Sequence, residues 1–236
     1  MNTTAHVSGG NSVCRVVRRA PSKPAYEFAK RLFDLTVSGA AILALSPVFI
    51  LSAALIYLEE RGPVFYRGER IGRDGKVFHI LKFRTMRLDA DKIPGPSSAG
   101  DDDPRITKLG GILRTLKINE LPQLFNVLNG SMSLVGPRPQ VAWDVANYTD
   151  EETAILSVPP GITDYASIRF HNEGEILKGS TDPDADYIRL IRPEKIQLQL
   201  KYLRERSFLT DLKILFRTAW VLVEDRLSRS RSENVH

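Results

Sequence analysis

The segment from residue 109 to residue 139 contains the residues whose types and spacing are most suited to chemistry. It places Glu120 just before a periodic apolar stretch and Arg138 between two prolines beyond that stretch. We expect Glu120 at the start of a helix, among backbone N–H groups that favour anions or a metal-bound phosphate. Pro137 and Pro139 stiffen the loop, so the Arg138 guanidinium loses little freedom when it binds phosphate. The segment therefore predicts a phosphate-binding site.

A short helix is expected to connect these two residues. Its apolar positions recur at i, i+3, i+4 and i+7, the spacing of a packed helical face: Leu121, Leu124, Phe125 and Leu128. Asn119 is suited to the N-cap, Pro122 to the first turn and Gly130 to the C-terminal cap.

Two short strands are expected upstream, over residues 64–66 and 76–83, with a polar turn around residues 73–75. Lys82 and Arg84 alternate with apolar neighbours, so the two cations would share one strand face. That face is either a solvated edge or, beside a phosphate-binding segment, a second contact for a diphosphate.

Residues 35–58 contain no charged side chain, which is enough length for a membrane-spanning helix. Ser46-Pro47 lies in the middle, and each half is about 11 residues, or about half the hydrocarbon thickness. Basic residues flank both ends, which favours both ends on the cytoplasmic face: Lys30, Arg31, Arg61, Arg67, Arg70 and Arg73. We expect a re-entrant hairpin, and a single span stays the alternative.

Seven ordered motifs resemble the bacterial sugar transferases, the small monotopic polyprenyl-phosphate phosphoglycosyl transferases. They are Lys30-Arg31-Leu32-Phe33-Asp34, Ser46-Pro47, Gly62-Pro63-Val64-Phe65-Tyr66, Lys82-Phe83-Arg84-Thr85-Met86, Asn119-Glu120-Leu121-Pro122-Gln123-Leu124, Gly136-Pro137-Arg138-Pro139 and Pro160-Gly161-Ile162-Thr163. The resemblance covers roughly residues 27–224. It departs at one position, because the usual Asp-Glu dyad of the family is Asn119-Glu120 here.

The resemblance implies transfer of a phosphosugar from a UDP-sugar to polyprenyl (undecaprenyl) phosphate with release of UMP. That reaction is the first membrane step of exopolysaccharide, capsule, O-antigen or other glycoconjugate synthesis, and the enzyme falls in the EC 2.7.8 class. The cofactor implied is Mg²⁺, with Glu120 and Asn119 as its ligands. The implied phosphate-binding residues are Arg138, Lys82, Arg84 and Pro137, and Ser46-Pro47 would set the hairpin angle.

Asn119 leaves the mechanism open. In this family the dyad Asp attacks the diphosphate to give a covalent phosphosugar, and an amide is a far poorer nucleophile than a carboxylate. Glu120 could replace it as nucleophile, or act as metal ligand and base for direct attack by the lipid phosphate. Asn119 could also be an N-cap and a metal-oriented amide in a working branch. The remaining alternative is a catalytically silent membrane scaffold; we expect an enzyme because Arg138, Lys82 and Glu120 remain.

The expected architecture is α+β in four parts. A disordered basic cytoplasmic tail (1–26) precedes a re-entrant membrane helix hairpin (27–60). A catalytic domain follows (61–226), mostly helical with a few short strands and interfacial amphipathic helices, and a disordered tail ends the chain (227–236).

Several elements of the catalytic domain are expected from local patterns. Residues 93–103 are a loop whose Asp101–Asp103 either bind a cation or cap the next helix. A basic helix is expected over residues 105–117 and a short strand within residues 158–169. The acidic stretch 171–186 is an exposed loop or recognises a particular sugar. A final helical stripe either packs or docks at the membrane interface: Leu212, Leu215, Phe216, Ala219, Leu222 and Val223.

The formal charge of +5 and the pI near 9.3 favour acidic partners, namely nucleic acid, anionic lipids or nucleotide sugars. A long apolar segment and the lack of aromatic–basic interleaving argue against nucleic acid. Cys14 is the single cysteine, which excludes an internal disulfide, and the four histidines are scattered. We expect the cytoplasmic face of a bacterial inner membrane, with anionic lipids as partners. A second copy of the chain and downstream glycosyltransferases are further candidate partners.

Overall fold

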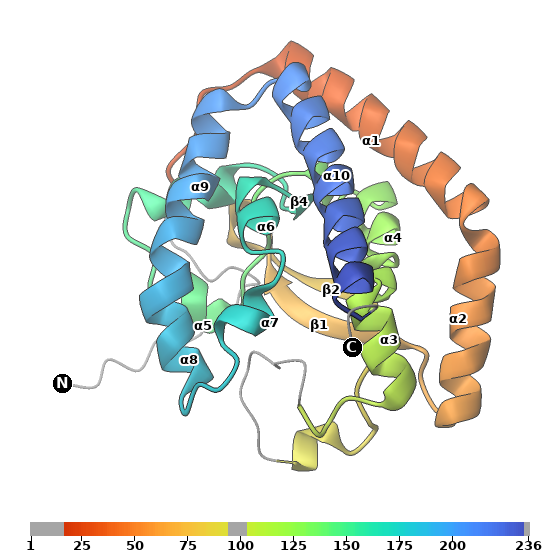
Figure 1. The fold of residues 1–236 in the computed structure, drawn as a ribbon. Helices are drawn as coiled ribbons and strands as arrows, with labels where there is room; N and C mark the ends of the chain where they lie inside the picture. The colour runs from red at the N-terminus through yellow and green to blue at the C-terminus, as the bar shows by residue number, and fades with distance from the viewer. Residues whose placement is uncertain (1–16, 94–102, 234–236) are drawn as a thin grey trace.

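The computed structural model describes residues 17–93 and 103–233. The strands lie in the middle of the molecule and helices surround them, as Figure 1 shows. This arrangement confirms the α+β class. Two helices, α1 (Pro24–Ala44) and α2 (Ser46–Glu59), form a bent arm along one side.

The break in the arm lies where the sequence predicts it. Pro47 falls in the first turn of α2, where the N–H that proline lacks would have no helical partner. Ser46 Oγ donates to the Leu43 carbonyl at 2.8 Å, and the two helices meet at 61°. Within the described ranges no helix alone is long and apolar enough to cross a membrane, whereas α1 and α2 together reach that length and composition. A broken span and a re-entrant hairpin both fit this pair.

The predicted hairpin of strands is confirmed. Strands β1 (Phe65–Ile71) and β2 (Val77–Phe83) pair antiparallel, and the 3₁₀ turn η1 (Arg73–Gly75) joins them. Asp74 adopts a left-handed φ of 60° in this turn, a conformation that Asp tolerates better than most residues. The first strand is longer than predicted.

A second, parallel sheet holds the proline-flanked loop. Strand β3 (Ser133–Val135) pairs with β4 (Gly161–Thr163). Just past β3, Gly136 lies so close to Gly161 that a Cβ on Gly161 would stand 2.1 Å from the Gly136 nitrogen. Only glycine fits this contact without moving the backbone. The short strand predicted within residues 158–169 is β4. The Asp164 side chain caps a helix directly after it.

The remaining elements are helical: η2 (Ala90–Lys92), α3 (Lys108–Thr115), η3 (Ile118–Glu120), α4 (Gln123–Leu128), α5 (Ala142–Val145), η4 (Glu152–Ser157), α6 (Tyr165–Arg169), α7 (Glu173–Ile176), α8 (Pro183–Asp186), the π-helical turn η5 (Tyr187–Ile191), α9 (Arg192–Glu205) and α10 (Phe208–Glu233). The acidic stretch 171–186 thus contains two short helices and is not a plain loop.

The helix predicted over residues 105–117 begins later, at Lys108. Thr107 Oγ1 accepts the Gly110 N–H at 2.9 Å and caps α3 there. Arg105 stays outside, paired with Asp103 at 2.6 Å. Asp103 therefore binds an arginine, while Asp101 and Asp102 lie outside the described residues.

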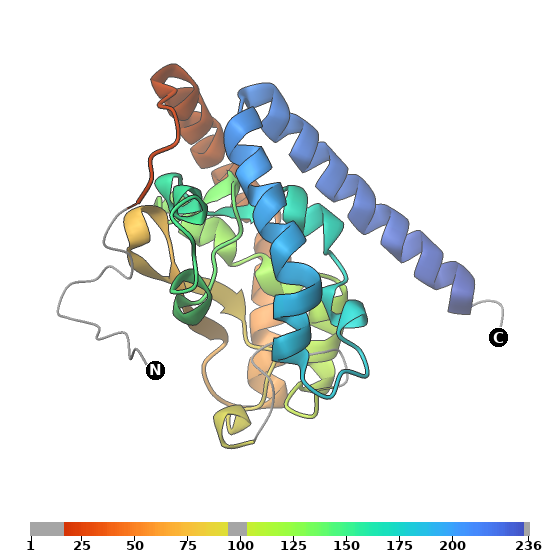
Figure 2. The same cartoon turned by 90° about the vertical axis from the view of Figure 1, so that its left-hand side faces the viewer.

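The described residues extend into both segments that the sequence analysis expects to be tails. Residues 1–16 lie outside the described residues, but Val17 packs against a buried cluster and the Arg18 N–H donates to Thr153 Oγ1 at 3.1 Å. At the other end α10 continues through Glu233, past the expected boundary at residue 226, and residues 234–236 are not described. Figure 2 shows α10 extending beyond the body of the molecule.

Helix α1 belongs to the main hydrophobic core. Phe33 and Val37 pack against a buried cluster built from β2, α4, β3, α9 and α10. The Arg31 guanidinium donates to the carbonyls of Val127 and Leu128 at 2.6 and 2.9 Å, so it satisfies acceptors at the C-terminal end of α4. The arm and the rest of the protein share one core.

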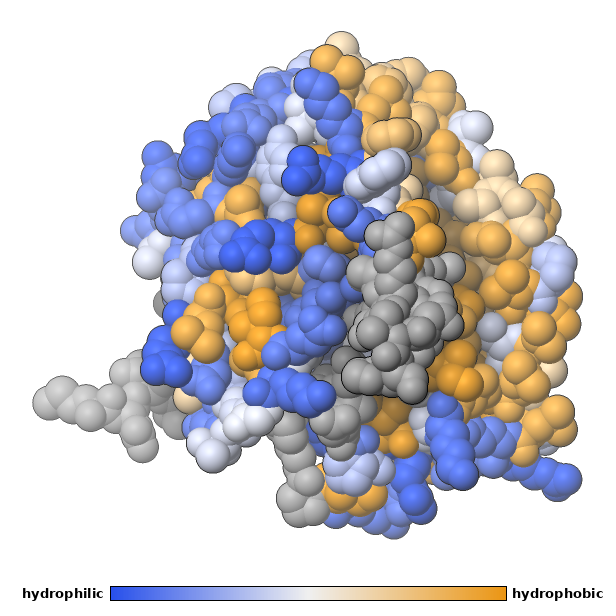
Figure 3. Space-filling view, in the orientation of Figure 1, coloured by the Kyte–Doolittle hydropathy of each residue, from blue (hydrophilic) through white to orange (hydrophobic). Residues whose placement is uncertain are grey.

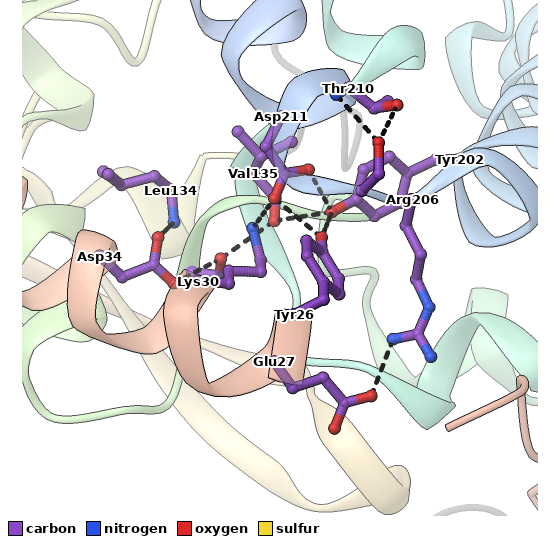
Figure 4. Close-up of polar contacts among 12 residues, drawn as sticks. Tyr26, Glu27, Lys30, Asp34, Leu134, Val135, Tyr202, Arg206, Thr210 and Asp211 are labelled. Carbon is purple, nitrogen blue, oxygen red and sulfur yellow. Dashed lines mark hydrogen bonds and ion pairs between the residues drawn. The ribbon is translucent and has the colours of Figure 1, made fainter. Parts of the chain in front are cut away.

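A buried polar network joins the base of α1 to α9 and α10 (Figure 4). Asp211, which is 3% exposed, accepts from Lys30 Nζ at 2.7 Å and from the hydroxyls of Tyr26 and Tyr202 at 2.8 and 2.9 Å. The Tyr202 hydroxyl also contacts the Val135 carbonyl at 3.3 Å. This network ties both ends of the chain to β3.

The surface of the arm is apolar. Figure 3 shows hydrophobic side chains gathered over the side that α1 and α2 form, and hydrophilic ones over the opposite side. Leu43 and Leu58 are each 77% exposed. Helix α10 is split: Ile214 is buried, whereas Phe216 and Trp220 are 74% and 62% exposed.

Candidate active site

A pocket of about 590 Å³ opens between β2, α4, α6, α7 and α10. It holds Lys82, Asn119, Glu120 and Arg138, residues that lie far apart in the sequence. The structure thus brings together these four of the residues that the sequence analysis expects at the site. A volume of this order suits a ligand as large as a nucleotide sugar.

Glu120 is bound by two cations at the centre of the pocket. Lys82 Nζ lies 2.9 Å from Glu120 Oε1, and Arg138 Nη1 lies 3.0 Å from Glu120 Oε2. Arg138 Nη2 also donates to Oε1, so the guanidinium grips the carboxylate with both arms. The three side chains are 23–26% exposed, which leaves the cluster open to a ligand.

The scaffold around Arg138 is rigid. The Gly136 N–H donates to the Thr163 carbonyl at 3.0 Å, and the Arg138 N–H donates to Asp164 Oδ2 at 3.3 Å. Gln199 Nε2 donates to the Arg138 carbonyl at 3.3 Å. The loop is held from β4 and α9, which supports the expectation of a guanidinium on a stiff segment.

Neighbouring charges, more than burial, determine the pKa of Glu120 in this cluster. Burial alone would raise the pKa of Glu120, but Arg138 and Lys82 outweigh it and hold that pKa well below the usual range. Burial lowers the pKa of Lys82, and Glu120 offsets part of the effect. Arg70 also lines the pocket, and burial together with the nearby Arg138 lowers its pKa. Glu120 thus faces more than one cation, and the positive surplus suits a diphosphate.

Asn119 and Glu120 do not begin a helix, contrary to the sequence prediction. Lys117 adopts a left-handed φ of 57° and turns the chain into η3, and Pro122 is the N-cap of α4. The anionic preference at Glu120 therefore arises from Lys82 and Arg138 and not from a helix end. Gly130, with φ of 86°, does follow the end of α4 as predicted.

The apolar face of α4 also differs from the prediction. Leu124 is buried as expected, but Val127 is also fully buried and Phe125 is 37% exposed. Phe125 instead packs edge-to-face against Phe49 of α2, with ring centroids 5.5 Å apart. The helix therefore packs against the arm as well as the core.

The structure does not bring Arg84 to the pocket. Strand β2 ends at Phe83, and the Arg84 guanidinium turns to the last turn of α2, where it donates to the carbonyls of Ile56 and Glu60. Pro137 is buried and does not line the pocket; its carbonyl accepts the Gly161 N–H at 3.0 Å. Ser46 and Pro47 lie at the break of the arm, outside the lining of the pocket.

Several pocket residues escape prediction from the sequence. Lys195, Glu173, Asp144 and Tyr187 reach the pocket from α9, α7, α5 and η5. Lys195 is only 7% exposed. No local motif marks them, because tertiary packing alone brings them together; the acidic character of residues 171–186 was the one available signal for Glu173.

A preformed metal cage is not present among the residues that the structure describes. The dyad nevertheless offers oxygen ligands. Asn119 is 8% exposed and its Oδ1 has no hydrogen-bond partner in the described parts of the chain. Mg²⁺ commonly binds through one or two protein oxygens together with waters and substrate phosphates. Asn119 and Glu120 fit a site of that kind.

The family model for "Bacterial sugar transferase" matches residues 25–225. An undecaprenyl-phosphate glucose phosphotransferase of Komagataeibacter xylinus is 38% identical over 209 residues, which are 86% of this chain and 37% of that protein. The exopolysaccharide production protein ExoY of Sinorhizobium fredii is 33% identical over 210 residues, 83% of this chain and 86% of ExoY.

A UDP-glucose:undecaprenyl-phosphate glucose-1-phosphate transferase of Escherichia coli is 37% identical over 196 residues, 81% of this chain and 39% of that protein. The chain thus spans well under half of two of these relatives and most of ExoY.

Proposed function

Because the chain belongs to the bacterial sugar transferase family, we propose that it transfers a phosphosugar from a UDP-sugar to undecaprenyl phosphate. The observation that carries the proposal is the two-armed grip of Arg138 on Glu120, with Lys82 beside it, inside a pocket of about 590 Å³. Relatives named for this chemistry and for exopolysaccharide production support it. An oxygen of the lipid phosphate becomes bonded to the sugar-bearing phosphorus, the bond to UMP breaks, and UMP leaves.

Arg138, Lys82 and Arg70 bind the diphosphate and neutralise its charge. Phosphate oxygens compete with Glu120 for these cations, so binding of substrate releases the Glu120 carboxylate. Glu120 and the side-chain Oδ1 of Asn119 are the residues that would hold Mg²⁺. Bound there, Mg²⁺ supplies further neutralisation of the phosphate charge.

Asn119 does not act as the nucleophile. Its amide is a weak nucleophile, and its oxygen is suited to orienting a cation or a phosphate-bound water. Glu120 is the one carboxylate of the dyad and carries the base or ligand role in direct attack by the lipid phosphate. Whether a covalent intermediate on Glu120 precedes that attack is settled by trapping radiolabelled phosphosugar on the protein.

The arm provides the membrane contact in this proposal. Its exposed apolar side chains and its break at Ser46-Pro47 fit a hairpin that enters and leaves the cytoplasmic face of the inner membrane. The exposed residues Phe216 and Trp220 of α10 fit the membrane–water interface. Lys213 and Arg217 on the same helix would attract anionic lipids. The pocket lining also includes the apolar residues Leu121, Val221 and Leu222, which suit the first isoprene units.

The test is a UMP-release assay with a panel of UDP-sugars and undecaprenyl phosphate, with and without Mg²⁺. We expect release with at least one sugar, and loss of release in Glu120→Gln. Glu175→Gln is the matched control, since Glu175 is exposed and does not line the pocket. A scaffold of the same fold predicts no release with any UDP-sugar. That outcome, obtained with folded protein in membranes, overturns the proposal.

A further inference from the structure

The pocket lining contains two chemically different groups of residues, called here its first and second ends. Lys82, Arg138 and Arg70 surround one carboxylate at the first end. The second end is lined by Asp144, Glu173, Lys195 and the ring of Trp143. The first end suits phosphates. In the second group Glu173 pairs with Lys195 and Asp144 pairs with Arg192, so the group is close to neutral and offers both hydrogen-bond donors and acceptors.

The lysine of the second end is held in place. Lys195 Nζ lies 3.3 Å from Glu173 Oε2 and 3.2 Å from the Tyr187 hydroxyl. Burial alone would lower the pKa of Lys195, but Glu173 and Tyr187 outweigh it and raise that pKa. The ammonium therefore stays protonated and presents donors at a fixed place. Tyr187 lies in the π-helical turn η5, a distortion that is common at functional sites.

Asp144 supplies an acceptor that the protein leaves unused. It is 1% exposed, and Arg192 Nε binds its Oδ1 at 2.6 Å. Its Oδ2 has no hydrogen-bond partner among the described residues, and neither has Ser167 Oγ in the same lining. A buried carboxylate oxygen without a partner is costly, which points to a ligand that donates to it.

We propose that Asp144, Glu173 and Lys195 form a subsite for the vicinal hydroxyl groups of the nucleotide sugar. A hydroxyl both donates and accepts, so neighbouring hydroxyls match an ordered carboxylate–ammonium pair. The exposed ring of Trp143, which meets Tyr187 edge-to-face at 6.5 Å, offers an apolar wall to the C–H face of a sugar ring. The ligand chemistry is that of a sugar ring, and either the transferred hexose or the ribose can supply it.

The subsite divides the acidic stretch 171–186 into two roles. Glu173 enters the pocket, whereas Asp182 caps α8 and Asp186 pairs with Arg189 on the outside. Of this stretch, Glu173 is the acidic residue placed to contact a sugar. The inference rests on the proposed function for its choice of ligand, but its test does not require turnover.

The experiment is isothermal titration calorimetry of the full-length protein in detergent with UDP-glucose, UDP-galactose and UDP. We expect Glu173→Ala to weaken binding of the preferred UDP-sugar about tenfold or more, since a hydrogen bond to a charged group is lost. Glu175→Ala, on the same helix and outside the pocket, is the control and leaves binding unchanged. Asp144→Asn is the second variant, with its melting temperature measured alongside.

Comparison of the three ligands shows whether the hexose or the ribose supplies the hydroxyl groups. If the hexose is bound, Glu173→Ala narrows the difference between the two UDP-sugars and leaves UDP binding unchanged. If the ribose is bound, all three ligands weaken equally. Unchanged affinities for all three ligands in both folded variants overturn the subsite. If the protein releases no UMP but Glu173→Ala still weakens UDP-sugar binding, the proposed transferase activity is contradicted and the subsite is supported.

Discussion

The carboxylate of Asp34 on helix α1 accepts the backbone N–H of Leu134 in strand β3 at 3.1 Å. Its second oxygen accepts from Ser133 Oγ at 2.7 Å. Strand β4 covers one edge of β3, and Asp34 satisfies the other edge. Arg138 follows β3 by three residues. A buried residue of helix α1 therefore holds the strand that leads to the guanidinium gripping Glu120.

Asp34→Ala is expected to lower kcat/KM for UMP release about tenfold or more, because an N–H is left unsatisfied and β3 shifts. If Asp34 acts through Arg138, the same change costs little further activity in an Arg138→Ala background. A double-mutant cycle measures this coupling. Equal losses in both backgrounds would mean a general effect on folding. Thr36→Ala, at an exposed position of α1, is the control.

Arg138→Lys keeps the positive charge and loses the two-armed grip. We expect kcat/KM to fall roughly 10- to 100-fold, since at least one charge-assisted hydrogen bond disappears. Steady-state UMP release measures the fall. Lys82→Arg, which adds donors instead of removing them, is expected to be milder; the reverse order would contradict the assignment of Arg138 as the main diphosphate contact.

Glu120→Gln is expected to abolish UMP release, while Asn119→Ala is milder, because the carboxylate carries the charge of the dyad. Asn119→Ala should raise the Mg²⁺ concentration needed for half-maximal rate. A Mg²⁺ titration of both variants against the wild type is the measurement. Full turnover in Glu120→Gln would remove Glu120 from the mechanism.

The stability of the protein should depend on pH through Glu120. Its pKa in the folded state is held below the ordinary value of 4.5, so the ionised carboxylate contributes stability that is fully present above that pH. This contribution is lost only as the pH falls below 4.5 and through the folded pKa. The difference in melting temperature between wild type and Glu120→Gln should persist at pH 5 and shrink below pH 4. A difference that shrinks already between pH 7 and 5 would contradict the lowered pKa.

Gly161→Ala should destabilise the fold, because the added Cβ would stand 2.1 Å from the Gly136 nitrogen and backbone must move. Overpacking of this kind costs about 1–3 kcal/mol. Gly111→Ala is the opposite case: nothing lies within 4 Å of its Cβ, and alanine in α3 favours the helix. Thermal unfolding of the two variants should therefore shift in opposite directions.

The part of the site that local sequence could predict is the part built from short motifs. Proline-flanked Arg138, Glu120 and the strand residue Lys82 each follow from their neighbours, and the structure joins them. The helix expected from Asn119 onward failed because the 3₁₀ turn η3 intervenes before Pro122. The prediction that Arg84 shares a strand face with Lys82 failed because β2 ends at Phe83, and strand alternation does not extend past that end.

The other end of the pocket depends on long-range packing. Lys195 meets Glu173 across 22 residues, and Arg192 meets Asp144 across 48. No periodicity or cap links these pairs. The sequence therefore indicates Arg138, Glu120 and Lys82, whereas for the second end it offers only the acidic character of residues 171–186.

The contact of Arg31 with the carbonyls of Val127 and Leu128 makes the first half of α1 and helix α4 one cooperative folding unit. Helix α4 has only six residues and depends on α1 both for packing and for the Arg31 donors that bind its last carbonyls. Its amides should exchange with deuterium in the same opening event as those in the first half of α1. In a variant that begins after residue 60, helix α4, which follows Asn119 and Glu120, is consequently expected to unfold. Deletion of α1 and α2 is therefore expected to abolish activity. An active variant without them would require a designed replacement for the first half of α1.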